Sequence, residues 1–117
     1  MLADIRPFGL PTHVRRETTD RLREALLALA QDQATILSHA ETRWASVTFT
    51  GARHRVELMF DCTEAIEAAE RFIAFLPEHE FDILGQLVAD ATVTEVDHRL
   101  DPPLMTVRCE LLLLEDG

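Results

Sequence analysis

The chain contains no lysine, no asparagine and no tyrosine, and it has only two cysteines, Cys62 and Cys109. Without lysine there is no amine for a Schiff base and no P-loop lysine, so pyridoxal-type and Walker-type chemistries are excluded. Two cysteines form no disulfide framework, and no apolar run is long enough to span a bilayer. The N-terminus carries a charge at Asp4 and lacks the apolar core of a signal peptide. We therefore expect a reduced, cytoplasmic protein.

Basic residues are scarce, and they are unevenly distributed. The chain has 11 arginines against 21 carboxylates, which gives a net charge of −10. Residues 1–55 carry eight arginines and six carboxylates, whereas residues 56–117 carry three arginines and fifteen carboxylates. Binding to phosphate needs several clustered cations. The charge therefore argues against nucleic acid and anionic membranes as partners.

Apolar residues are plentiful, at 47% of 117 residues, which is enough for one domain with its own core. Their three- and four-residue spacing predicts a first helix somewhere within residues 12–41. Its apolar stripe comprises Leu22, Ala25, Leu26, Leu29, Ala30, Gln33, Ile36, Leu37 and Ala40.

Alternating apolar and polar residues then predict a hairpin that ends at Phe60. The Gly51-Ala52 pair suits a two-residue type II′ turn between its strands. That turn places Val47 opposite Val56, so the apolar faces of the two strands coincide.

A second helix is predicted from Asp61, because Glu64 follows at the spacing of a capping box. Pro77 ends it. Its buried stripe comprises Ile66, Ala69, Ile73 and Leu76. Its outward glutamates are expected to offset arginines at the start of the first helix, which would cancel part of the charge division.

Residues 84–99 and 103–114 predict a second hairpin, joined through the four-residue turn 100–103. This register places Arg108 opposite Glu95 and Val96 opposite Val107. Farther from the turn, it places Ala89, Ala91 and Val93 opposite Leu114, Leu112 and Glu110 respectively.

The order of elements predicts a single α+β domain made of two αββ units. We expect a four-stranded antiparallel sheet with both helices on one face. The alternative is a ferredoxin-like core with an extra C-terminal strand, in which residues 2–8 would form the first strand.

The most chemically suggestive segment is Glu78-His79-Glu80, followed by Asp82. These side chains could supply oxygen and nitrogen ligands to a divalent metal. Neighbouring residues of one loop cannot all point at one ion, however. The alternative is a solvated acidic loop anchored by Phe81 and Ile83.

His54 is a second candidate, because the predicted hairpin places it opposite Phe49 at the rim of the apolar face. A pocket mouth could form there. The alternative is a partly exposed histidine with local hydrogen bonds. Cys62 falls at the start of the second helix, where we interpret it as a small buried residue.

A third candidate is the uncovered face of the sheet. The predicted registers place Trp44 across from Met59 on this face, and Leu112 and Leu114 join them from the last strand. An apolar patch on an unlidded sheet face is a candidate interface. We therefore expect a homodimer.

The segment Leu76–Ala91, with the sequence LPEHEFDILGQLVADA, resembles a segment of short uncharacterised proteins of alphaproteobacteria. That group has no assigned activity, so the resemblance implies no catalytic residues. A bacterial source also agrees with the lysine-free composition, which is typical of GC-rich genomes.

No catalytic constellation emerges from these patterns, and no cofactor is expected. The sequence favours a non-enzymatic, self-associating α+β domain that binds a partner protein or a small ligand. The alternative is a metal-dependent or acid–base enzyme that uses Glu78, His79, Glu80 and Asp82.

Overall fold

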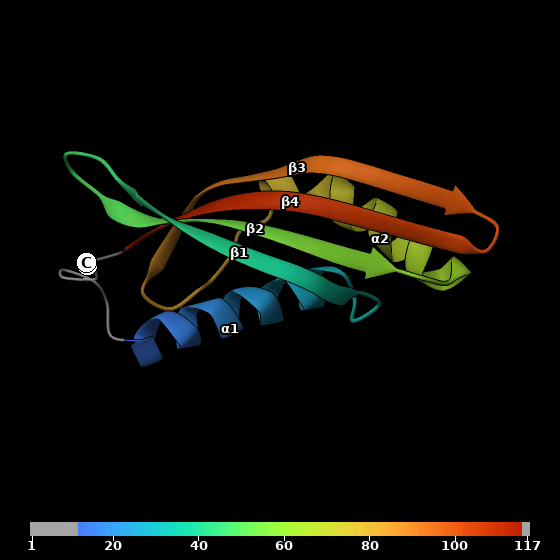
Figure 1. The fold of residues 1–117 in the computed structure, drawn as a ribbon, viewed down its shortest axis with the longest axis horizontal. Helices are drawn as coiled ribbons and strands as arrows, with labels where there is room; N and C mark the ends of the chain where they lie inside the picture. Colours follow the sequence, from blue (N-terminus) through green and yellow to red (C-terminus); the bar gives the residue numbers. More distant parts are fainter. Residues whose placement is uncertain (1–11, 116–117) are drawn as a thin grey trace.

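The computed structural model describes residues 12–115. Two αββ units follow one another along the chain, as Figure 1 shows. The first comprises α1 (Thr12–Leu29), β1 (Thr35–Ala45) and β2 (Thr50–Phe60), and the second comprises α2 (Thr63–Phe75), the short 3₁₀ helix η1 (Leu76–Glu78), β3 (Gln86–Leu100) and β4 (Pro103–Glu115). The predicted α+β class with two αββ units is confirmed. The strand considered at residues 2–8 lies outside the described residues.

All four strands form one antiparallel sheet in the order β1-β2-β4-β3. Each hairpin contributes its second strand to the centre, so the two αββ units meet through β2 and β4. The ferredoxin-like alternative is wrong, because that core would place a first strand beside β2, where the structure has β4. The long strands give the molecule an elongated shape of 49 × 28 × 22 Å.

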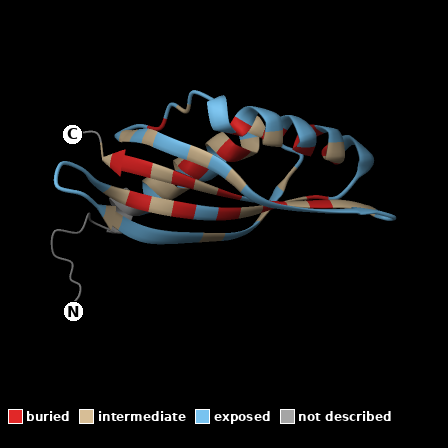
Figure 2. Ribbon diagram, turned by 90° about the horizontal axis from the view of Figure 1, so that it is seen from above, coloured by how far each residue is buried: buried red, intermediate tan, exposed pale blue. Residues whose placement is uncertain are grey.

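Both helices cover the same face of the sheet, as predicted. Buried side chains alternate along the two central strands, and Figure 2 shows this alternation (buried residues in red). One core cluster contains Leu22, Leu26 and Ala30 of α1; Ala65, Ala68, Ala69 and Phe72 of α2; Val56, Leu58 and Phe60 of β2; and Met105, Val107, Cys109, Leu111 and Leu113 of β4. The opposite face, called the outer face below, has no described helix over it.

The first helix is shorter than the apolar spacing predicts. It ends at Leu29, and Gln31 and Asp32 adopt left-handed conformations with φ of 59° and 57°. The Asp32 N–H donates to the Leu27 carbonyl at 2.8 Å, which completes a helix-ending turn. Residues 35–45, the end of the predicted stripe included, form β1 instead.

The first hairpin turns earlier than predicted. Residues 46–49 form the loop, so Ala45 pairs with Thr50, and Gly51 lies inside β2 opposite Trp44. A Cβ at Gly51 would collide with the carbonyl oxygen of Leu113. This glycine therefore allows the backbone of β4 to approach β2 closely, and it is not part of a turn.

The second helix is close to its prediction. It begins after Cys62, without a side-chain cap, and the 3₁₀ turn that contains Pro77 follows it. The capping-box prediction for Asp61 is therefore wrong, because the N-cap is Cys62 and no side chain caps the helix. Cys62 is exposed, contrary to our interpretation. Ile66 and Ile73 are partly buried against the core.

The second hairpin has the predicted turn, with Leu100 paired to Pro103 and Arg108 opposite Glu95. Its far end differs, because β3 contains register shifts between Val88 and Asp90 and between Val93 and Glu95. Each shift adds one residue to β3. The predicted partners of Ala89, Ala91 and Val93 are therefore wrong: Ala91 faces Leu111 and Val93 faces Cys109, while Ala89 lies at a shift and has no partner.

Candidate functional site

A ladder of charges runs across the middle of the outer face. The guanidinium of Arg108 on β4 contacts Glu57 of β2 at 3.2 Å and Glu95 of β3 at 2.9 Å. Arg53 of β2 lies 3.8 Å from Glu110 of β4. These pairs join arginines and carboxylates of adjacent strands. We call Arg53, Glu57, Glu95, Arg108 and Glu110 the charge ladder.

The charge ladder offsets part of the charge division, but not between the helices as expected. Within the part of the chain whose side chains are described, Glu64, Glu67 and Glu70 of α2 form no ion pair. The opposite charges of the two halves are instead paired between strands, where Arg53 of residues 1–55 contacts Glu110 of residues 56–117.

An apolar row crosses one end of the outer face. Trp44 of β1 lies opposite Gly51, Gly51 opposite Leu114 of β4, and Leu114 opposite Leu87 of β3. Leu114 is only 7% exposed although neither described helix covers it, and it lies outside the core cluster, whereas Leu87 is 54% exposed. We call these four residues the apolar row. Leu112 lies beside it on the same face of β4.

Met59 does not belong to this row. It pairs with Thr35 at the other end of the hairpin, so the predicted opposition of Trp44 and Met59 is wrong. The misplaced turn is the cause, because it shifted every partner along β1. Trp44, Leu112 and Leu114 remain together on the outer face, and Met59 is separated from them by the charge ladder.

A histidine pair lies on the opposite face, between the sheet and α1, with His54 buried and His39 half-buried. Arg23 of α1 donates from Nε to His39 Nδ1 at 3.0 Å, and His39 Nε2 lies 2.9 Å from His54 Nδ1. Because His39 Nδ1 accepts from the guanidinium, its ring proton is on Nε2 and is donated to His54. The three side chains therefore form one directed hydrogen-bond chain.

Both rings are held neutral. Burial lowers the pKa of His54 to about 4. Burial, followed by the nearby His54 and Arg23, lowers the pKa of His39 to about 4, while Glu41 acts in the opposite direction. Desolvation disfavours the imidazolium form, and a second positive charge beside Arg23 would be repelled.

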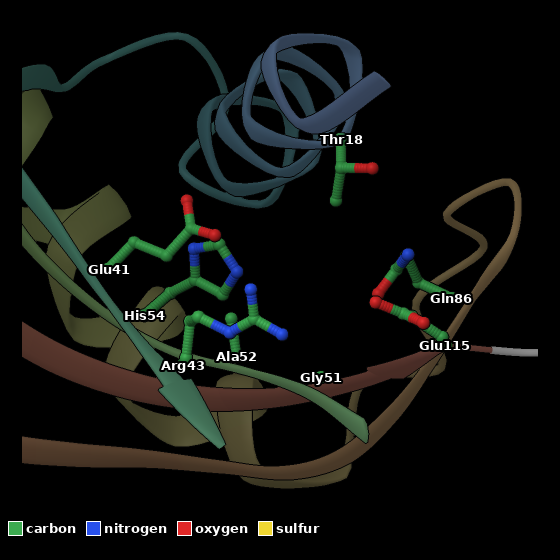
Figure 3. Close-up of a pocket in the computed structure, with 8 residues that line it drawn as sticks. All are labelled: Thr18, Glu41, Arg43, Gly51, Ala52, His54, Gln86 and Glu115. Carbon is green, nitrogen blue, oxygen red and sulfur yellow. The ribbon is translucent and has the colours of Figure 1, made fainter. Parts of the chain in front are cut away.

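His54 also lines a small cavity, drawn in Figure 3 with Glu41 and Arg43 of β1 on one side and Gln86 and Glu115 on the other. Its volume is about 40 Å³, which is room for about three waters. The predicted position of His54 at an exposed rim is wrong, although a cavity does form beside it. His54 lies opposite Glu41 and not Phe49, it is 1% exposed and not at a rim, and Phe49 lies in the hairpin loop.

The sequence pattern does not reveal the histidine pair, because it predicts a helix over residues 35–41, which the structure places in β1. Strand alternation from His39 to Arg43, with a turn at residues 46–49, would have placed His39 and His54 on one face of neighbouring strands. Arg23 could not have been found this way, because its contact depends on how α1 packs on the sheet.

The acidic side chains of residues 78–82, in the loop after α2, do not converge on one point. The His79 ring packs edge-on against Phe81, with centroids 4.6 Å apart. Among residues 12–115, no three or more His, Cys, Asp or Glu side chains come together as a metal would require, those of residues 78–82 included. Ile83 is 4% exposed and Phe81 is partly buried, so these two anchor the loop.

Comparisons with known proteins bear on the fold. The sequence matches no protein-family model and no curated protein. A solved structure titled "Virion of native gene transfer agent (GTA) particle" contains a chain of similar fold, with a TM-score of 0.50 and 13% sequence identity. The match covers 86% of this chain and 92% of that chain. Within the described residues, neither helix has the length and apolar content to cross a membrane.

Proposed function

We propose that this chain is a non-enzymatic, self-associating structural domain that binds a partner protein through the outer face of its sheet. The observation that carries the proposal is the apolar row on a face that no described helix covers. A partly exposed tryptophan and an exposed leucine at one end of a sheet, beside charged side chains, are typical of a protein contact.

The fold likeness supports a role in assembly, because the similar chain belongs to the solved virion of a gene transfer agent particle. The resemblance of residues 76–91 to short alphaproteobacterial proteins fits the same proposal, since it brings no catalytic residues with it. We propose membership of that group on this segment.

The cavity beside His54 is too small to bind a drug-sized ligand. About 40 Å³ holds only water, whereas sites for small molecules measure about 300–1,000 Å³. The histidine pair is already satisfied by Arg23 and by its own hydrogen bond. We therefore assign the pair to stability and the apolar row to binding.

The test is capture of partners from the source cells by tagged wild type, Trp44→Asp and Arg16→Asp. Arg16 is an exposed residue of α1, so its charge reversal controls for added negative charge. A protein retained by wild type and by Arg16→Asp, and lost with Trp44→Asp, supports the proposal. Equal retention by all three variants, or capture of no protein, contradicts it.

A second measurement locates the contact. Trp44 is the only tryptophan and the chain has no tyrosine, so the chain's own emission, after the emission of the free partner is subtracted, reports on the apolar row. Binding of the captured partner to the purified chain is expected to shift the emission to shorter wavelength and to reduce quenching by acrylamide. An unchanged emission in the complex would place the contact elsewhere.

A further inference from the structure

The outer edge of β3 is the longest unpaired strand edge of the described sheet. β3 has 15 residues and pairs with β4 on one side only. Beyond the shift at residues 93–95, its pairing with β4 runs unbroken from Glu95 to Leu100. Its other edge presents N–H and C=O groups to solvent, which is a template for another strand. Figure 1 shows this segment at the end of the molecule where the β3–β4 turn projects.

Apolar side chains accompany this edge. Val96 pairs with Val107, and Leu100 pairs with Pro103, so both lie on the face of the sheet that bears the helices. They nevertheless remain 43% and 80% exposed. No part of residues 12–115 buries them, although they belong to the apolar side of the sheet.

Charged side chains on the other face are also unmatched. Asp97 and Arg99 alternate with Val96 and Leu100, so they lie on the outer face. Neither forms an ion pair within the described chain, whereas the neighbouring Glu95 is held by Arg108.

We propose that a second copy of this chain pairs with residues 96–100 of β3, antiparallel, about a twofold axis at His98. This inference rests on the self-association in the proposed function and names its contact. In this register Asp97 of each copy faces Arg99 of the other copy, so the symmetric dimer contains this pair twice. On the helix-bearing face, Val96 meets the second copy's Leu100, again twice. The two four-stranded sheets become one continuous sheet.

Charge complementarity selects this register. With the helices of both copies on the same side, the axis must pass through a residue of β3. An axis at Val96 would place Glu95 opposite the second copy's Asp97. An axis at Asp97 would place Asp97 opposite Asp97 of the second copy, and an axis at Arg99 would place Arg99 opposite Arg99, so like charges would be opposed. Only the axis at His98 joins opposite charges and opposes no like charges within the strand.

The contact is short, with five residues from each copy, so a dimer that depends on concentration is expected. Its dissociation constant is measured by sedimentation equilibrium for wild type, Arg99→Asp, Asp97→Arg and the Asp97→Arg, Arg99→Asp double variant. Each single reversal replaces attraction by repulsion in both symmetric pairs. It should weaken the dimer about tenfold or more.

The double variant restores opposite charges, so its dissociation constant should return to within about threefold of wild type. Arg16→Asp changes the net charge as Arg99→Asp does, and it should leave the dimer unchanged. A wild type that stays monomeric, single variants that dimerise normally, or a double variant no better than the singles would each overturn the proposal.

Tryptophan emission separates this contact from the apolar row, because Trp44 lies at the opposite end of the sheet. Dilution of the dimer should leave the Trp44 emission unchanged. A shift on dilution, together with loss of the dimer in Trp44→Asp, would overturn the edge contact and place self-association on the row. Failure of the edge contact leaves the partner capture with Trp44→Asp unaffected, so the two proposals fail separately.

Discussion

His39 Nε2 and His54 Nδ1 lie 2.9 Å apart, and Arg23 donates to the other ring nitrogen of His39 at 3.0 Å. This arrangement requires His39 to be neutral, because a proton on its Nδ1 would face the guanidinium. It requires the same of His54, whose Nδ1 accepts the His39 proton. Protonation of either ring therefore breaks the chain of hydrogen bonds that joins α1 to the sheet.

Stability should fall as the pH drops from about 6.5 to about 4. Both rings have a pKa of about 4 in the folded chain, against 6.5 for a free imidazole. Between these values the unfolded chain binds more protons, so the free energy of unfolding rises with pH. Urea unfolding at about pH 7 and about pH 4.5 should show a loss on the order of 2 kcal/mol from His54, and a smaller loss from the more exposed His39, whose interactions are screened by solvent.

Variants separate this loss from the titration of carboxylates. His54→Leu removes one ring and should flatten the pH dependence, whereas His79→Gln removes an exposed histidine and should retain it. If His54→Leu and wild type lose equal stability over this range, the pair does not titrate as described.

Gly51→Ala should destabilise the chain on the order of 2 kcal/mol or more, because its Cβ would collide with backbone atoms of β4. Gly85→Ala provides a matched control. Gly85 has a φ of 78° but no atom within 4 Å of an added Cβ, so only backbone strain of about 1 kcal/mol is expected. Denaturant unfolding of both variants measures the difference, and equal losses would contradict the close approach of β4 to Gly51.

The two cysteines should react with thiol reagents at very different rates. Cys62 is exposed, whereas Cys109 is 1% exposed and burial raises the pKa of its thiol to about 12. Reaction needs the thiolate and access to it. Native protein should therefore be labelled at one thiol, which Cys62→Ser abolishes, and denatured protein at both. Rapid labelling of native Cys62→Ser would show that Cys109 is accessible.

Arg108→Leu should cost little stability at low salt and less at high salt. The Arg108 side chain is exposed, and its two ion pairs are screened by solvent and ions. Melting temperatures of wild type and variant, measured at low and at high sodium chloride, should converge as salt rises. A difference that stays constant with salt would assign the loss to packing of the arginine stem.

The second αββ unit could be predicted from sequence because its local signals agree with its tertiary contacts. Pro77 marks the end of α2, and the turn at Asp101-Pro102 fixes the register that places Arg108 opposite Glu95. The register failed beyond Val93, because nothing in the sequence marks the two places where β3 contains an extra residue.

The first unit was mispredicted for two physical reasons. β1 has a register shift at Leu37, so Ile36 and His39 lie on one face although they are three residues apart. That spacing imitates a helix. The helix ends at Leu29 and is followed by the left-handed residues Gln31 and Asp32, with no glycine to mark its end. Gly51 then resembled a turn residue, although it is a glycine because the backbone of β4 leaves no room for a Cβ at this position.

The candidate sites depended on these elements. The outer-face position of Leu112 and Leu114 followed from strand alternation and is correct. The predicted contact of Met59 with Trp44 and the predicted exposure of His54 depended on the misplaced turn, and both are wrong. Contacts such as that of Arg23 with His39 involve a helix and a strand, and no spacing rule gives them.

The pairing of β2 with β4 also affects how the chain folds. Each hairpin joins residues close in sequence, whereas the central pairing joins Gly51 to Leu114 and Phe60 to Met105. Local hairpins form quickly, and distant pairings form late. During synthesis, the edge of β2 therefore stays open until β4 has been made. In that interval the β4 of another copy can occupy the same edge with the same contacts. Exchange of whole hairpins between copies is thus the specific misassembly that this topology favours at high expression.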